Sequence, residues 1–160
     1  MEIKFDVHIT SHVLYDYLMQ HIYHSTQGIL GTTVGALLVV LFAMRPKEYL
    51  LALIFGIIIL LYLPVSMWLK AKAQALNPVF KEPLHYVMNE EGVSVSQGET
   101  TQEQLWENLY KAVSTKTSII LYTSRLNACI FPREDLKEQT AAVIEAISTH
   151  MDPGKVKIRG

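Results

Sequence analysis

Two long apolar stretches dominate the pattern of hydrophobic and polar positions along the chain. No charged side chain occurs within residues 25–44 or 49–69. A helix that crosses about 30 Å of hydrocarbon needs roughly 20 apolar residues. The pattern therefore predicts a transmembrane helical hairpin over residues 25–69, with spans at about 26–44 and 49–69 joined by a short charged turn.

The region before the hairpin, residues 1–24, predicts a strand followed by an amphipathic helix. Apolar side chains alternate with polar ones at Ile3, Phe5, Val7 and Ile9, which is the period of a half-buried strand. A lone strand is unstable. Because a hairpin returns the chain to the same side of the membrane, we expect this strand to join a sheet formed after the hairpin.

The chain after the hairpin changes to strand periodicity. Residues 70–82 predict a helical connector, and residues 83–160 predict a soluble module of short strands, closed by an amphipathic helix at 135–150 and a basic tail. Gly92 follows the first of these strands, where a positive φ is expected in the turn. The predicted strands are 84–88, 93–97, 99–105, one that ends at 114, 118–123 and 127–131.

These patterns predict an α+β membrane protein. It combines a two-helix transmembrane hairpin with an antiparallel β-sheet, and the C-terminal helix caps that sheet. The N-terminal strand completes the sheet, so the soluble module is split in sequence by the hairpin.

Charge and cysteine content narrow the function classes and the location. After Leu69, eleven Lys and Arg oppose eleven Asp and Glu, and this balance argues against a nucleic-acid partner. The single cysteine, Cys129, cannot form an intrachain disulfide and favours a reducing compartment. Lys70 and Lys72 next to the second span favour cytoplasmic termini by the positive-inside rule, although Arg45 and Lys47 in the turn favour the opposite orientation.

Small residues at helical spacing mark packing faces within the two spans. Gly31 and Gly35 lie four residues apart in the first span, and Ala52 and Gly56 in the second. This spacing lets two backbones approach closely. The faces pack against each other inside the hairpin, or the first span forms a homodimer.

A search for chemistry yields no catalytic set, no cofactor motif and no metal site. His21 and His24 stand three apart, a spacing at which two histidines can share a metal, but no third ligand is evident. Polar residues at a membrane interface are the simpler interpretation. Cys129 lies within a predicted strand, where a buried and inert thiol is expected.

Three side chains are candidates for contact with a partner or with lipid headgroups. Trp106 serves either the core or a binding surface. Arg125 at a hairpin tip and Arg133 after the last strand could reach anionic headgroups, or they are solvated surface charges.

Several short segments, in this order, resemble the YcxB-like family of small bacterial membrane proteins. The segments are Asn-Pro-Val-Phe-Lys at 77–81, Glu-Gly-Val-Ser-Val-Ser-Gln at 91–97, Trp106, Ile-Leu-Tyr-Thr-Ser at 120–124 and Asn-Ala-Cys-Ile-Phe-Pro at 127–132. The resemblance implies a location in the bacterial cytoplasmic membrane. It also implies a pleckstrin-homology-like C-terminal domain, with a strongly bent antiparallel sheet, and it supplies no catalytic residues.

The expected function is that of a non-enzymatic integral membrane protein. Its cytoplasmic module would bind a protein partner or modulate a membrane complex. An oligomeric transport or peptide-protection component is the alternative, and a membrane enzyme is a third hypothesis.

Overall fold

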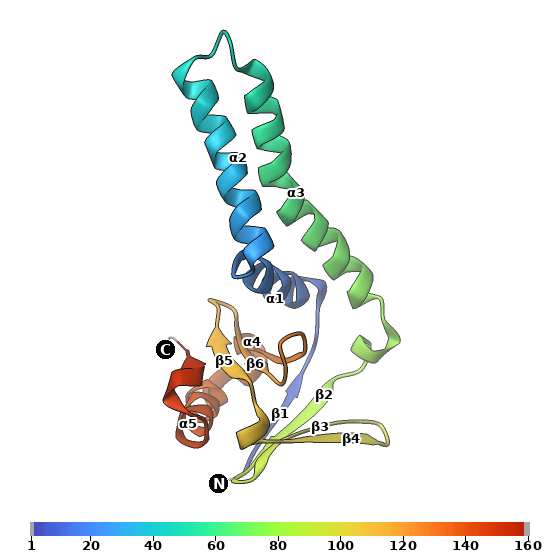
Figure 1. Ribbon diagram of the computed structural model, residues 1–160. Helices are drawn as coiled ribbons and strands as arrows, with labels where there is room; N and C mark the ends of the chain where they lie inside the picture. The colour runs from blue at the N-terminus through green and yellow to red at the C-terminus, as the bar shows by residue number, and fades with distance from the viewer. Residues whose placement is uncertain (1, 159–160) are drawn as a thin grey trace.

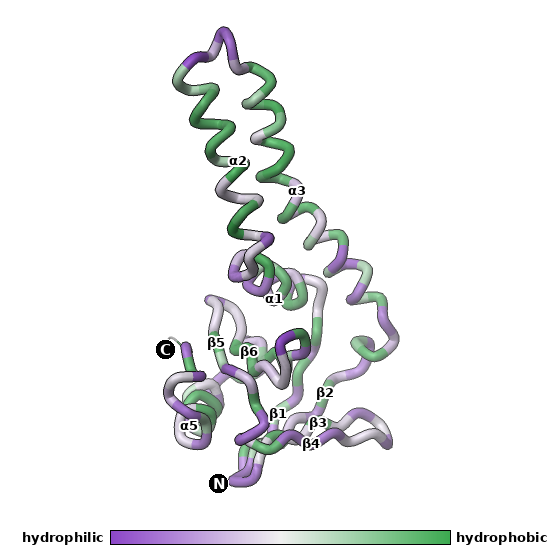
Figure 2. Tube along the Cα trace, viewed as in Figure 1, coloured by the Kyte–Doolittle hydropathy of each residue, from purple (hydrophilic) through white to green (hydrophobic). Residues whose placement is uncertain are grey.

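Two long helices project from the rest of the molecule as an antiparallel hairpin (Figure 1). The computed structural model describes residues 2–158, and the two helices are α2 (Thr26–Met44) and α3 (Leu50–Ala75). Both are long and apolar enough to cross a membrane, and only 11% of the residues in the most apolar window of each are buried. Figure 2 shows the hydrophobic colour along both helices and a hydrophilic turn between them. The rest of the described chain therefore leaves most of the hairpin uncovered.

Helix α1 (Ser11–Tyr23) lies between this hairpin and the remaining body of the molecule (Figure 1). Its first turn is capped by Thr10, whose hydroxyl accepts a hydrogen bond from the Val13 amide at 3.3 Å. Val13 and Leu14 are buried in the same core cluster as Ala71 of α3. The hairpin and the body consequently share part of one hydrophobic core.

The body contains two four-stranded sheets, with strand orders β1-β2-β3-β4 and β7-β6-β5-β8. In the first sheet β1 pairs antiparallel with β2, from Ile3 opposite Met88 to Val7 opposite Leu84. In the sequence, helices α1, α2 and α3 therefore lie between β1 and β2, two strands that are neighbours in one sheet. The strands are β1 (Ile3–Val7), β2 (Leu84–Met88), β3 (Gly92–Gln97), β4 (Thr100–Leu105), β5 (Lys111–Ser114), β6 (Ser118–Tyr122), β7 (Ala128–Pro132) and β8 (Val156–Lys157).

The α+β class and the helical hairpin agree with the sequence patterns, but the expected single antiparallel sheet is wrong. The strands divide into two sheets, and β8 adds a parallel pair to β5, with Ala112 opposite Val156. This strand lies where the sequence predicts only a basic tail. A short turn, Pro153–Lys155, returns the chain to β5, and the Gly154 amide donates to Asp152 Oδ1 at 2.8 Å at its start.

The C-terminal helix is also not continuous from 135 to 150. It divides into α4 (Arg133–Leu136), a 3₁₀ turn (Lys137–Gln139) and α5 (Thr140–His150). The break lies at Lys137, whose φ of +49° is the one positive φ of a non-glycine residue within 2–158. Leu136 is fully buried before the break, and Val143 and Ile147 are fully buried after it. The break therefore lets two helical segments place apolar side chains in one core.

Gly92 does not supply the expected positive φ; that conformation occurs at Gly98, with φ of +56° in the loop before β4. Gly92 belongs to β3, and a Cβ atom there would lie 2.1 Å from the carbonyl oxygen of Gln104 on β4. The residue is a glycine because two strand backbones cross closely at this point.

An aromatic cluster lies where the two sheets face each other. Phe5 of β1 and Tyr86 of β2 both contact Phe131 of β7 in edge-to-face geometry, with ring centroids 5.3 and 4.9 Å apart. Such pairs add to the burial of apolar area. The cluster fixes the first sheet, which contains the N-terminal strand, against the second.

Candidate functional site

The small residues of the two spans lie inside the hairpin. A Cβ atom on Gly56 would lie 3.0 Å from the carbonyl oxygen of Gly35, and one on Gly35 would lie 2.8 Å from Cγ of Leu60. The contact at Gly31 is looser, since a Cβ atom there would be 3.8 Å from its nearest neighbour, and Ala52 is half-buried. Gly35 and Gly56 therefore mark the closest approach of α2 and α3.

Trp106 lies in the core. Its side chain is only 5% exposed, its indole N–H donates to the Asn89 carbonyl at 2.9 Å, and its ring stacks on His150 with centroids 5.1 Å apart. The ring thus closes one end of the body and offers little surface to a partner or to lipid.

The two arginine candidates lie on different elements. Arg125 is exposed in the loop between β6 and β7, whereas Arg133 is half-buried at the start of α4, where its amide donates to the Thr117 carbonyl at 2.8 Å. Arg133 lines an open cavity beside α1 together with residues of the β5–β6 turn. The loop arginine remains on the surface, and the second arginine is part of the junction between α1 and the body.

His21 lies in the last turn of α1, and His24 directly follows the helix. Among residues 2–158 there is no group of three His, Cys, Asp or Glu side chains that could hold a metal ion. His24 Nδ1 instead lies 2.8 Å from the Gln20 carbonyl, and the His21 ring stacks on Tyr122. Both rings are held by neighbouring groups of the protein.

The cysteine is half-buried on β7. Burial raises the pKa of the Cys129 thiol, and its hydrogen bond with Tyr86 lowers that pKa to a smaller extent. A thiol with a raised pKa is a poor nucleophile at neutral pH.

The most exposed regular element of the body is strand β4. All six of its residues are exposed. It forms the end of its sheet, and its outer edge pairs with no strand of the described chain. Figure 1 shows the β3–β4 hairpin extending away from the helices that cover the body. No lysine or proline interrupts the strand, although such residues commonly protect exposed edges.

The direction of the β4 backbone groups follows from its register. The Trp106 amide donates to the Glu91 carbonyl just beyond the end of the strand, and Gly92 lies opposite Leu105. Hydrogen-bonded pairs alternate along an antiparallel ladder. The amides of Gln104, Gln102 and Thr100 therefore face β3. Those of the alternate residues, Thr101, Glu103 and Leu105, face outward.

The sequence predicts a strand here but not its exposed position. One signal was available: the run Thr-Thr-Gln-Glu-Gln has no apolar alternation, so neither face of this strand is suited to a core. The place of the strand at the end of its sheet depends on the whole strand order.

Part of the chain is similar to a known protein family. Residues 89–151 match the family model described as YcxB-like protein. The match runs from the loop before β3 through α5, while the motif at 77–81 lies outside it. No curated protein and no solved structure matches the chain. The resemblance found in the sequence is thus confirmed over residues 89–151, the part of the chain that matches the YcxB-like family model.

Proposed function

We propose that this protein is a non-enzymatic, membrane-anchored binding module whose edge strand β4 pairs with an extended segment of a partner protein. The hairpin α2–α3 anchors it in the bacterial cytoplasmic membrane. The body is a pleckstrin-homology-like module on the cytoplasmic side, together with both termini. Partner binding would modulate a membrane complex.

The membrane location is supported by the length and surface of the hairpin. At about 1.5 Å per residue, α2 extends roughly 28 Å, which matches the hydrocarbon thickness of a bilayer. Charged Arg45 and Glu48 pair at the tip, 3.2 Å apart. Near the other end of the hairpin, Lys72 Nζ lies 3.9 Å from the centroid of the Trp68 ring. Tryptophan and lysine are favoured at membrane interfaces.

The partner class is supported by the outer edge of β4, which is the observation that carries the proposal. Its outward amides and carbonyls are the groups that an added strand would pair with. The edge carries one charged residue, Glu103, and its other five residues are uncharged. An extended polypeptide segment satisfies these groups through its own backbone, and the side chains of the strand would set its specificity.

The oligomeric alternative, a transport or peptide-protection component, has less support. It was expected from Gly31 and Gly35, yet Gly35 already packs against α3 within one copy of the chain. We therefore favour the binding module.

A photocrosslinking experiment tests the proposal in full-length protein in native membranes. A photoreactive residue is placed at Thr101 on β4 and, as a control position, at exposed Ser148 on α5. We expect a discrete crosslinked protein at position 101. Glu103→Pro should reduce it to the level of the Ser148 control, because proline removes an outward amide without removing a bond to β3.

The matched variant is Glu103→Ala, which removes the same side chain but retains the amide. Crosslinking at position 101 should survive this substitution. Three outcomes would overturn the proposed partner. They are equal crosslinking at both positions, crosslinking that Glu103→Pro does not reduce, and a product made of two copies of this chain.

The orientation of the hairpin across the membrane is tested separately, with reporters fused at residue 47 and at the C-terminus. The proposal requires a cytoplasmic signal from the C-terminus and the opposite signal from residue 47.

A further inference from the structure

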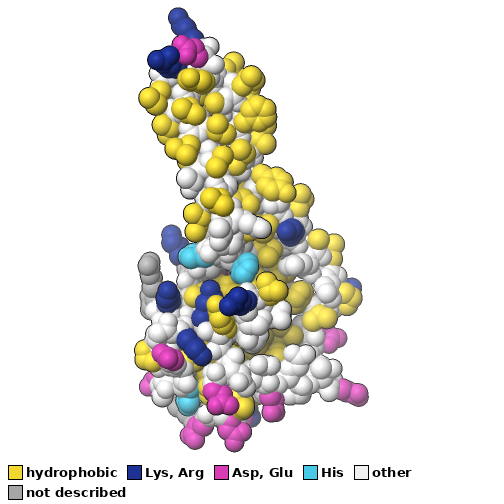
Figure 3. Space-filling view, in the orientation of Figure 1, with side chains coloured by type: hydrophobic (Ala, Val, Ile, Leu, Met, Phe, Trp, Pro, Cys, Tyr) yellow, Lys and Arg dark blue, Asp and Glu magenta, His cyan; other side chains and the backbone are white. Residues whose placement is uncertain are grey.

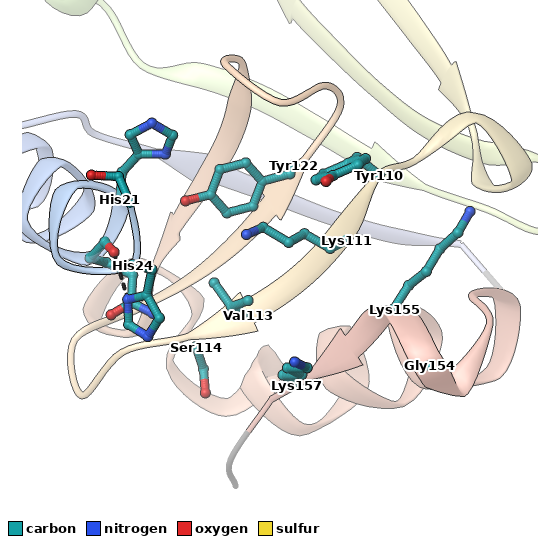
Figure 4. Close-up of a pocket in the computed structure, with 12 residues that line it drawn as sticks. His21, His24, Tyr110, Lys111, Val113, Ser114, Tyr122, Gly154, Lys155 and Lys157 are labelled. Carbon is teal, nitrogen blue, oxygen red and sulfur yellow. Dashed lines mark hydrogen bonds between the residues drawn. The ribbon is translucent and has the colours of Figure 1, made fainter. Parts of the chain in front are cut away.

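A cavity of about 610 Å³ lies between the C-terminal end of α1 and the second sheet. Gln20, His21, His24 and Ser25 line it from the helical side, and residues of β5, β6 and the C-terminal segment line it from the other (Figure 4). Its volume is in the range of small-molecule sites. Neither β4 nor any of the predicted contact residues belongs to it.

The lining of this cavity is basic. Lys111, Lys155 and Lys157 are among its lining residues, and none of the described residues that line it is Asp or Glu. The Lys111 side chain points toward Tyr122 and the two histidines (Figure 4), with its Nζ 4.6 Å from the centroid of the Tyr122 ring. The Lys155 side chain points away from the two histidines (Figure 4), and its Nζ donates to the Leu109 carbonyl at 3.2 Å. The cavity therefore presents several hydrogen-bond donors and a positive charge without an internal counterion.

The cavity also lies at the base of the hairpin. Ser25, one of its lining residues, is the N-cap of α2 and accepts a hydrogen bond from the Gly28 amide at 3.1 Å. Exposed Ile29 and Leu30 follow on the apolar surface of α2. Figure 3 shows Lys, Arg and His side chains on the part of the body next to the hairpin, and acidic side chains at the far end. An anion in the cavity would thus lie beside the apolar helices that acyl chains would cover.

We propose that this cavity binds the phosphate group of an anionic phospholipid, with Lys111 and Lys157 as its principal ligands. The headgroup would enter from the bilayer surface while its acyl chains remain along α2. Lysine ammonium groups bind phosphate oxygens as point charges. The inference depends on the proposed insertion of the hairpin into a membrane, and it is independent of partner binding at β4.

Lipid titration of the full-length protein, followed by native mass spectrometry from detergent micelles, tests this inference. We expect phosphatidylglycerol to bind at least about tenfold more tightly than zwitterionic phosphatidylcholine, because each nearby lysine favours an anionic headgroup. Lys111→Gln/Lys157→Gln should abolish that preference. Inorganic phosphate and glycerol 3-phosphate form two further arms, and tight binding of either would assign the cavity to a soluble phosphate compound instead of a lipid.

The matched control is Lys70→Gln/Lys72→Gln, which removes the same charge next to the bilayer but outside the cavity. It should retain the preference for phosphatidylglycerol. An equal loss in both double variants, or equal binding of both lipids to the wild-type protein, would overturn the proposal. If the double variant does not fold, Lys157→Gln at an exposed position gives the same comparison.

Flotation with vesicles separates this result from the proposed membrane location. A chain that does not float with lipid would contradict the insertion of the hairpin. A chain that floats but does not distinguish the two lipids would contradict the cavity assignment alone.

Discussion

The carboxylate of Asp16 on α1 accepts a hydrogen bond of 2.7 Å from the hydroxyl of Thr117 in the turn between β5 and β6. A second hydroxyl in that turn, from Thr115, donates to the same oxygen at 2.5 Å. From the next residue of α1, the Tyr17 hydroxyl donates to the Leu126 carbonyl at 3.1 Å. These bonds attach the helix at the base of the hairpin to the second sheet.

Substitution of this carboxylate should loosen the attachment. Asp16→Ala removes both acceptor contacts, and hydrogen bonds to charged groups contribute about 1.5–3 kcal/mol each when they are well enclosed. Because this site is only half-buried, we expect a loss of about 1–2 kcal/mol in the free energy of unfolding. Thermal unfolding in detergent micelles measures it. Glu107→Gln, at an exposed position, is the control and should change stability by less than about 0.5 kcal/mol.

The glycines of α2 and α3 should differ in their tolerance of substitution, because only some of them lie where the two helices cross. Gly56→Ala places a methyl group 3.0 Å from the Gly35 backbone oxygen, which cannot move aside as a side chain can. Overpacking of this kind costs about 1–3 kcal/mol. Gly31→Ala meets only an ordinary contact and should be neutral or stabilising, because alanine is the better helix former. Equal unfolding midpoints for the two variants in micelles would contradict this view of the hairpin.

The two glycines of the β3–β4 hairpin should respond in opposite ways. Gly92→Ala drives a methyl group into the Gln104 carbonyl and should destabilise the first sheet by about 1–3 kcal/mol. Gly98→Asn should be tolerated, because nothing lies within 4 Å of a Cβ atom there and asparagine adopts positive φ readily. Denaturant unfolding measures the stability of both variants. A larger loss of stability for Gly98→Asn would show that the close crossing of the strands is not the reason for a glycine at position 92.

Buried tyrosines make stability sensitive to alkaline pH. Burial raises the pKa of Tyr122 to about 12, with a smaller contribution from Tyr17, and burial also raises the pKa of Tyr86. An unfolded tyrosine ionises near pH 10. The folded state therefore keeps its full stability below about pH 10 and loses it as the pH rises toward about 12, because the unfolded chain releases its protons first.

Unfolding experiments at a series of pH values measure this loss. Tyr122→Phe should flatten the decline, since phenylalanine has no proton to release. A decline of unchanged steepness in that variant would exclude Tyr122 as its source.

Much of the fold follows from local patterns, and the exceptions have physical causes. The alternation at Ile3, Phe5 and Val7 predicts a strand because one face of it is buried, and β1 has the burial pattern that this requires. Strand β8 is only two residues long, so no period can be read from it. The break at Lys137 has neither glycine nor proline to mark it, and it follows from the packing of buried side chains on both sides.

The candidate sites were harder to predict than the fold. The residues of the basic cavity come from α1, β5 and the C-terminal segment, and no local spacing connects Lys111 with Lys157. Trp106 was visible in the sequence, but its role was not. A single aromatic residue in a polar stretch suits a surface or a core equally well. Tertiary structure decides between these roles.

The pairing of β1 with β2 sets an order of events during biosynthesis. Ile3–Val7 leaves the ribosome first, but its partner Leu84–Met88 appears only after both long helices have been made. The first sheet can close only when the antiparallel hairpin has brought β2 back beside β1. Once it has closed, the sheet connects the chain before the hairpin to the chain after it. Separation of either helix from its neighbour would therefore require the body to unfold.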